Sequence, residues 1–161
     1  MHPLNALKKI AAGLLFLGVA FVSGNAVAQQ ASEMDAVKAA SKAFYMALTV
    51  FDNGEAMEKV WAHTPYVTFV GPRSKSIMVG WDTQKKYWMD SNKMFSQRNV
   101  TLSNQHIHFN GSLAWEMGHE IADVKLKDGT ASKTDQIVTN VYEKTGARWV
   151  MVSHHVQPQP Q

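Results

Sequence analysis

The sequence contains no cysteine and only five prolines among its 161 residues. Without cysteine the chain has no disulfide, no thiolate nucleophile and no cysteine-ligated zinc or iron–sulfur centre. A large excess of positive or negative charge is also missing, because the 16 basic residues are nearly balanced by 13 acidic ones. Phosphate-binding loops, dinucleotide fingerprints and nucleophile elbows are absent as well. The 45% hydrophobic content indicates a folded protein of one domain.

Only one long apolar run is present, from Ile10 to Val22. Two basic residues, Lys8 and Lys9, precede it, and the small residues Ala26-Val27-Ala28 follow it. This order predicts a secretory signal peptide over residues 1–28, cut after Ala28, and hence a periplasmic or secreted protein. The run is short for a bilayer span, so we expect no membrane association after cleavage.

Removal of residues 1–28 leaves 133 residues with a formal charge of +1, because two lysines are lost. The remaining basic residues are scattered rather than striped. A chain of this kind has no electrostatic footprint for nucleic acid, and we expect no such partner. We predict one domain over 32–157 and a disordered Gln/Pro tail over 158–161.

The order of hydrophobic periods predicts an α+β fold. Helical spacing indicates helices at about 33–50, from about 52, and at 81–90, the first beginning near Ser32. Alternation indicates strands at 66–70, 77–79, 96–109, 112–126, 132–144 and 148–156, and the pairs Asn110-Gly111, Asp128-Gly129 and Thr145-Gly146 are hairpin signals between the last four. The last four form an antiparallel meander. We expect a curved, cone-shaped antiparallel sheet with the three N-terminal helices packed on its concave face.

Two segments resemble the SnoaL-like branch of the nuclear transport factor 2-like superfamily. The first is Val60–Trp81, with its Trp61-x-His63 and Gly80-Trp81 pairs, and the second is Thr139–Pro158. The second is also similar to the end of the calcium/calmodulin-dependent kinase II association domain. The resemblance implies a cone-shaped barrel, usually dimeric, in a family that includes cyclases, dehydratases, isomerases and epoxide hydrolases. Relatives often carry a pocket arginine where this chain has Ile137, which disfavours an anionic ligand.

Catalysis in a cone requires a buried acid or base. Residues 115–121 alternate, so His119 shares one face with large apolar residues, while Glu116 and Glu120 share the other with small ones. If the apolar face lines the cavity, His119 lies inside, which is the interpretation we prefer. If that face packs a dimer instead, Glu116 lines the cavity. Asp135, on a largely apolar strand face, is the second candidate catalytic residue.

Aromatic residues supply the expected ligand-binding wall, because such pockets are mainly apolar. His63 could donate to a ligand or cap the neighbouring backbone. The ligand-binding candidates are Tyr45, Trp61, His63, Tyr66, Trp88 and Trp115, with Phe44 and Leu48 beside them.

Histidine pairs raise the question of a metal. His106 and His108 share one strand face, whereas the adjacent His154 and His155 point oppositely. No HExxH or other metal-ligand spacing is present, so we expect no metal site and no cofactor. By the same family resemblance, His155 is expected to have a structural role.

These observations favour an exported domain that binds a small apolar molecule in its cone, as a homodimer. The alternative is a cofactor-free lyase, isomerase or hydrolase acting on a small hydrophobic substrate through Asp135 or His119. A third possibility is a homo-oligomeric assembly domain. A large apolar pocket that holds a buried carboxylate would favour the enzyme.

Overall fold

The computed structural model describes residues 18–157. The chain divides at residue 33 into two units, of which Met34–Gln161 carries the sheet and the site. The basic residues at 8 and 9, the first part of the apolar run and the tail 158–161 lie outside the described residues. No described helix is both long and apolar enough to cross a membrane.

The first helix, α1 (Gly18–Leu48), is longer than the predicted one. A start at Ser32 is wrong, because neither glycine nor proline interrupts residues 26–47 and the helix passes through Ser32. The predicted apolar face is confirmed, since Val37, Phe44 and Leu48 are buried. The short α2 (Glu55–Glu58) begins three residues after the predicted start near 52, and Asp52 accepts hydrogen bonds from the Gly54 and Ala56 amides.

Strands follow the predicted order. They are β1 (Thr68–Val70), β2 (Met78–Val79), β3 (Phe95–Asn110), β4 (Leu113–Leu126), β5 (Ala131–Thr145) and β6 (Arg148–Gln157), with α3 (Trp81–Asn92) after β2. Gly111 and Gly129 adopt positive φ in the turns that the Asn-Gly and Asp-Gly pairs predicted.

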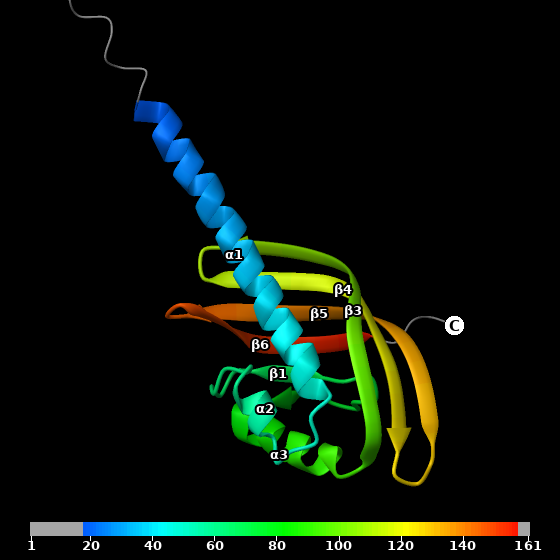
Figure 1. The fold of residues 1–161 in the computed structure, drawn as a ribbon. Helices are drawn as coiled ribbons and strands as arrows, with labels where there is room; N and C mark the ends of the chain where they lie inside the picture. Colours follow the sequence, from blue (N-terminus) through cyan, green and yellow to red (C-terminus); the bar gives the residue numbers. More distant parts are fainter. Residues whose placement is uncertain (1–17, 158–161) are drawn as a thin grey trace, which may run out of the picture. The chain divides into compact units, whose positions relative to one another are not determined.

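One six-stranded sheet results, in the order β2-β1-β6-β5-β4-β3. The meander β3–β6 is antiparallel, as predicted, whereas the parallel pairing of β1 with β6 was not foreseen. Figure 1 shows the long strands β3, β4 and β5 bending, so that the sheet is curved and unclosed. Helices lie on its concave face, which confirms the expected α+β cone.

An aromatic cluster joins the helices to the sheet. Phe69 of β1 contacts Trp88 of α3 and His154 of β6, with ring centroids 4.9 and 5.2 Å away. Phe44 of α1 lies 6.1 Å from Trp61 and 5.0 Å from His154. His154 is therefore built into the middle of the core.

Candidate functional site

The two faces of β4 are opposite to our preferred interpretation. Glu116, Glu120 and the small residues between and beside them are buried, whereas Trp115, Met117 and Ile121 are exposed and His119 is half-exposed. The expectation that His119 lies in the cavity is wrong. A Cβ on Gly118 would meet the Ser103 carbonyl oxygen at 2.7 Å, so only glycine fits at this inward position.

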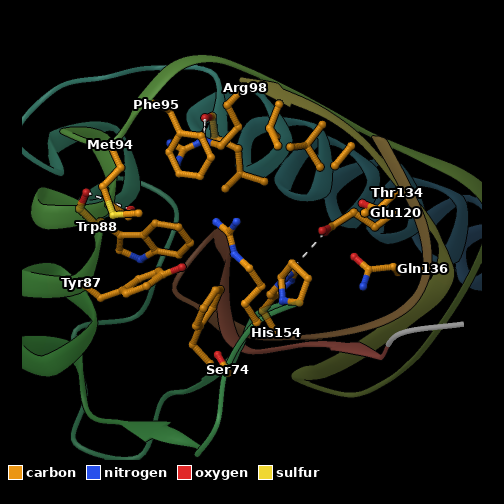
Figure 2. A pocket seen from close by; sticks show the side chains of 18 of the residues that line it. Ser74, Tyr87, Trp88, Met94, Phe95, Arg98, Glu120, Thr134, Gln136 and His154 are labelled. Carbon is orange, nitrogen blue, oxygen red and sulfur yellow. Dashed lines mark hydrogen bonds and ion pairs between the residues drawn. The ribbon is translucent and has the colours of Figure 1, made fainter. Parts of the chain in front are cut away.

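A cavity of about 500 Å³ opens between α3, the loop after β1 and the concave ends of β3–β6. Figure 2 shows Tyr87, Trp88 and Phe95 on one side, facing Glu120, Gln136 and His154 on the other. The lining residues that carry the argument are Tyr87, Trp88, Arg98, Glu120, Gln136 and His154. Aromatic and aliphatic side chains form one part of the lining and polar or charged side chains form the rest, so the cavity can hold a small molecule that has both apolar and polar groups.

Glu120 is the acidic residue of this cavity. Burial raises the pKa of its carboxyl group to about 7, and a hydrogen bond from the Tyr45 hydroxyl only partly offsets that rise. Its Oε2 atom has no hydrogen-bond partner among the described residues, and neither has Oε1 of Gln136, its cross-strand neighbour. A carboxyl group that is half protonated near neutral pH can both give and accept a proton.

His154 faces Glu120 from β6, with Nε2 3.7 Å from Oε2 of Glu120 (Figure 2). Burial, with a smaller contribution from His155, lowers the pKa of His154 to about 3, so the ring is neutral. At 3.7 Å between a neutral ring and a carboxyl group, the contact is not an ion pair, and it is longer than a hydrogen bond. His155 points to the outer face and is exposed.

The tautomer of His154 follows from its other neighbour. Nδ1 lies 2.7 Å from Oδ1 of Asn140, whose amide nitrogen donates to Glu116 at 2.7 Å and to the Tyr45 hydroxyl at 3.2 Å. Because that amide is already the donor, Oδ1 must accept, and Nδ1 carries the proton. Nε2 is left with its lone pair, directed at Glu120.

Glu116 holds Asn140, and through it His154, in place. It is fully buried and accepts hydrogen bonds from Gln105 at 2.6 Å, Asn140 at 2.7 Å and Tyr142 at 2.5 Å. Both carboxylate oxygens are thereby occupied, so Glu116 is a positioning residue and does not reach the cavity lining. The alternative interpretation, in which the face of β4 that carries Glu116 points into the cone, was therefore right about the orientation of the strand.

The predicted catalytic pair lies on the outer face. His119 Nδ1 is 2.8 Å from Asp135 Oδ1, and the two side chains are 36% and 51% exposed. Trp115 is on the same face, stacked on His108 with centroids 5.5 Å apart. Ile137 also points outward, so its identity carries no information about the charge of a ligand in the cavity.

The other predicted ligand contacts divide into three groups. Trp88 and Leu48 line the cavity, as expected. Phe44, Tyr45 and Trp61 are buried in the core without lining it. His63 and Tyr66 are exposed: His63 contacts the Glu58 carbonyl at 2.8 Å and stacks on Trp81, and Tyr66 donates to Glu143 at 2.6 Å.

Our sequence interpretation missed Glu120, His154 and Arg98 as cavity residues. A signal existed for the first two, because Glu120 shares a face with small residues and His154 alternates with His155. In residues 18–157 no group of three or more histidine or acidic side chains is placed to hold a metal ion.

The class of protein is given by comparison with known families. Residues 37–157 match the model of the SnoaL-like domain, and the chain belongs to that family. No curated protein matches it.

Solved structures agree on the fold. A candidate dehydratase of the NTF2-like family from Streptomyces avermitilis has a TM-score of 0.72 and 20% identity, covering 81% of this chain and 99% of its own. An NTF2-like superfamily protein from Salmonella enterica has a TM-score of 0.73 and 18% identity, and the match covers 82% of this chain and 94% of that protein. The association domain of C. elegans CaMKII has a TM-score of 0.61 and 18% identity, and the match covers 81% of this chain and 98% of that domain. These identities support the fold and not a shared reaction.

Proposed function

We propose that the protein binds a small, largely apolar molecule in its cavity and moves a proton on it without a cofactor, as a lyase or isomerase. The observation that carries this proposal is the buried Glu120 facing the neutral His154 across 3.7 Å. The cavity adds the necessary space and an apolar wall. A candidate dehydratase among the structural neighbours is consistent with such chemistry.

Glu120 acts as the proton carrier in this proposal. Its carboxylate takes a proton from a substrate carbon, and the resulting acid returns that proton to a leaving hydroxyl or to a second carbon. The first outcome eliminates water and the second moves a double bond. His154 accepts a hydrogen bond at Nε2 and so orients the substrate or Glu120. Asn140 holds the ring through Nδ1.

A general test compound for proton abstraction can show whether Glu120 acts as a base, without knowledge of the natural substrate. In 5-nitrobenzisoxazole, removal of one C–H proton breaks the N–O bond and releases a coloured phenolate, so any base in an apolar pocket accelerates the reaction. We expect the parent protein to catalyse this elimination, with a rate that rises with pH to a plateau above about 7, as the Glu120 carboxylate forms. Glu120→Gln should lower the rate by roughly 100-fold.

His119→Gln and Asp135→Asn are the matched controls, because they alter a carboxylate–histidine pair outside the cavity. Both should leave the rate unchanged. An equal rate in Glu120→Gln and the parent would contradict the catalytic proposal. If an apolar dye still binds in that case, the protein is a binding domain without a reaction.

We also propose that the protein is a homodimer through the outer face of the sheet. That face exposes Trp115, Met117, Ile121 and Ile137, each more than one-third exposed, a grouping that usually marks an interface. CaMKII association domains among the structural neighbours are consistent with assembly. Light scattering of the chain from residue 29 should give twice the monomer mass, and Met117→Glu should give the monomer. A parent protein that is monomeric at all concentrations would contradict the dimer.

Export is proposed on the sequence signal at residues 1–28. The predicted cut after Ala28 lies within α1, where residues 26–30 have exposed side chains. Mass spectrometry of the protein outside the cytoplasm should find an N-terminus at Gln29. Full-length chain found in the cytoplasm alone would contradict export.

A further inference from the structure

The charges of the cavity lining are unbalanced. Three lining residues are basic, namely Arg73, Lys75 and Arg98, and Glu120 is acidic. None of the ion pairs between described residues involves any of the three cations. Below a pH of about 7 the Glu120 carboxyl group is mostly neutral, so it does not neutralise them either. The cavity therefore presents uncompensated positive charge to whatever enters it.

Arg98 is a buried cation of the cavity lining, with only 7% of its surface exposed. Its Nε donates to the Leu48 carbonyl at the end of α1, and Nη2 donates to Oδ1 of Asn92 at 2.7 Å. A guanidinium has five N–H donors, so three remain without a partner in the described chain. Phe51 and Phe95 lie against it at 5.3 and 5.0 Å.

A buried cation whose neighbours are neutral is an expensive arrangement. Burial lowers the pKa of Arg98 to about 10, which is the expected result when no anion compensates the lost water. Both Arg98 and Arg73 also act on the Tyr87 hydroxyl, since each opposes the rise that burial causes in its pKa. The geometry is consistent with this influence, because Arg73, Arg98 and Tyr87 all line the cavity.

Glu120 makes no ion pair with Arg73 or Arg98; its contact in the cavity is with His154 of β6. The aromatic rings of Phe69 and Trp88 line the space as well.

We propose that the ligand of this cavity is a small aromatic or alicyclic carboxylic acid, whose carboxylate binds to Arg98 and Arg73 beside Tyr87. Its apolar body then lies against the aromatic wall, and its far end reaches Glu120 and His154. This inference rests on the proposed function and adds the charge class of the substrate. It replaces the apolar ligand that the sequence favoured on the basis of the aromatic residues, the nearly balanced charge and Ile137. Guanidinium forks match carboxylates in shape as well as in charge.

The experiment compares two isosteric probes, trans-cinnamate and trans-cinnamamide, by isothermal titration calorimetry at pH 6, where Glu120 is protonated. We expect cinnamate to bind at least about tenfold more tightly, since a charge-assisted hydrogen bond exceeds a neutral one by roughly that factor. Arg73→Gln should remove most of this preference and leave cinnamamide binding unchanged. Arg73 is exposed, so the variant should fold.

Lys127→Gln is the matched control, because it removes one exposed positive charge that does not line the cavity. Arg98→Gln should also lose the preference, but it breaks two structural hydrogen bonds, so its folding is checked by circular dichroism. If the two probes bind equally to the parent, the carboxylate inference fails and the cavity proposal stands. If cinnamate is preferred but Arg73→Gln and a folded Arg98→Gln behave like Lys127→Gln, the proposed anion site is wrong. If neither probe binds at millimolar concentration, both proposals fail.

Discussion

Two carboxylate–histidine pairs lie back to back in this sheet, and their difference is instructive. His119 and Glu120 are neighbours on β4 but point to opposite faces. The outer pair, His119 with Asp135, is closer, at 2.8 Å, and in the single chain both groups are open to water. The inner pair, Glu120 with His154, is 3.7 Å apart, and its side chains are only 6% and 3% exposed. Burial, rather than a short contact, adjusts the inner pair for proton transfer.

The largest expected contrast is in stability. Glu116→Ala removes the acceptor of two buried hydrogen bonds, from Asn140 and Tyr142, and of a part-buried one from Gln105, and should lower the free energy of unfolding by about 3–5 kcal/mol. Both variants are made in the Met117→Glu background, in which the outer face is not covered by a second copy. There Asp135→Ala should cost less than about 1 kcal/mol, because water solvates both partners. Urea unfolding of both variants checks this, and equal losses would remove the distinction between the faces.

The inner pair also predicts a pH dependence. Glu120 has a raised pKa when folded, so its contribution to stability falls as pH rises from about 4.5 to 7. His154 has a lowered pKa when folded, so its contribution rises with pH from about 3 to 6.5. Between about pH 4.5 and 6.5 the two slopes have opposite signs and cancel in the parent.

A variant that lacks one of the two groups should show the pH dependence of stability that the other group contributes. In Glu120→Gln, stability should increase by about 3 kcal/mol, relative to the parent, from pH 4.5 to 6.5. In His154→Gln it should decrease by a similar amount from pH 4.5 to 7. Denaturant titrations at several pH values measure both. Parallel profiles for the two variants and the parent would mean that neither group is perturbed by burial.

Two tyrosine–carboxylate hydrogen bonds give a smaller and closely matched test. Tyr142 donates to Glu116 at 2.5 Å inside the domain, and Tyr66 donates to Glu143 at 2.6 Å on the surface. Tyr142→Phe should lower stability by about 1.5–3 kcal/mol, because it leaves a buried carboxylate one donor short. Tyr66→Phe should leave the unfolding midpoint where it is. A larger loss in the exposed variant would reverse the comparison.

Much of the fold was predictable because hydrophobic period and turn residues are local signals. The four long strands and their Asn-Gly, Asp-Gly and Thr-Gly turns were predicted nearly to the residue. The start of α1 was not, because Ser32 resembles a helix cap even inside a longer helix. The parallel pairing of β1 with β6 joins distant segments and leaves no local pattern.

The site was harder to predict, because alternation divides a strand into two faces without saying which is concave. On β4 we weighed both faces and preferred the one with large apolar residues. Gly118, with Ala114 and Ala122, marks the other face as the crowded one, where only small side chains and hydrogen-bonded carboxylates fit. Arg98 gave no signal, since one basic residue in a polar strand also fits a solvated surface.

The central claim is that Glu120 is a buried acid which titrates near neutral pH. The most direct measurement follows the side-chain carboxyl carbon of Glu120 by ¹³C NMR from pH 3 to 9, with Glu120→Gln to assign the resonance. We expect a midpoint at a pH of about 7 for Glu120 in the folded protein. A midpoint near 4.5, the value of a carboxyl group in water, would contradict it.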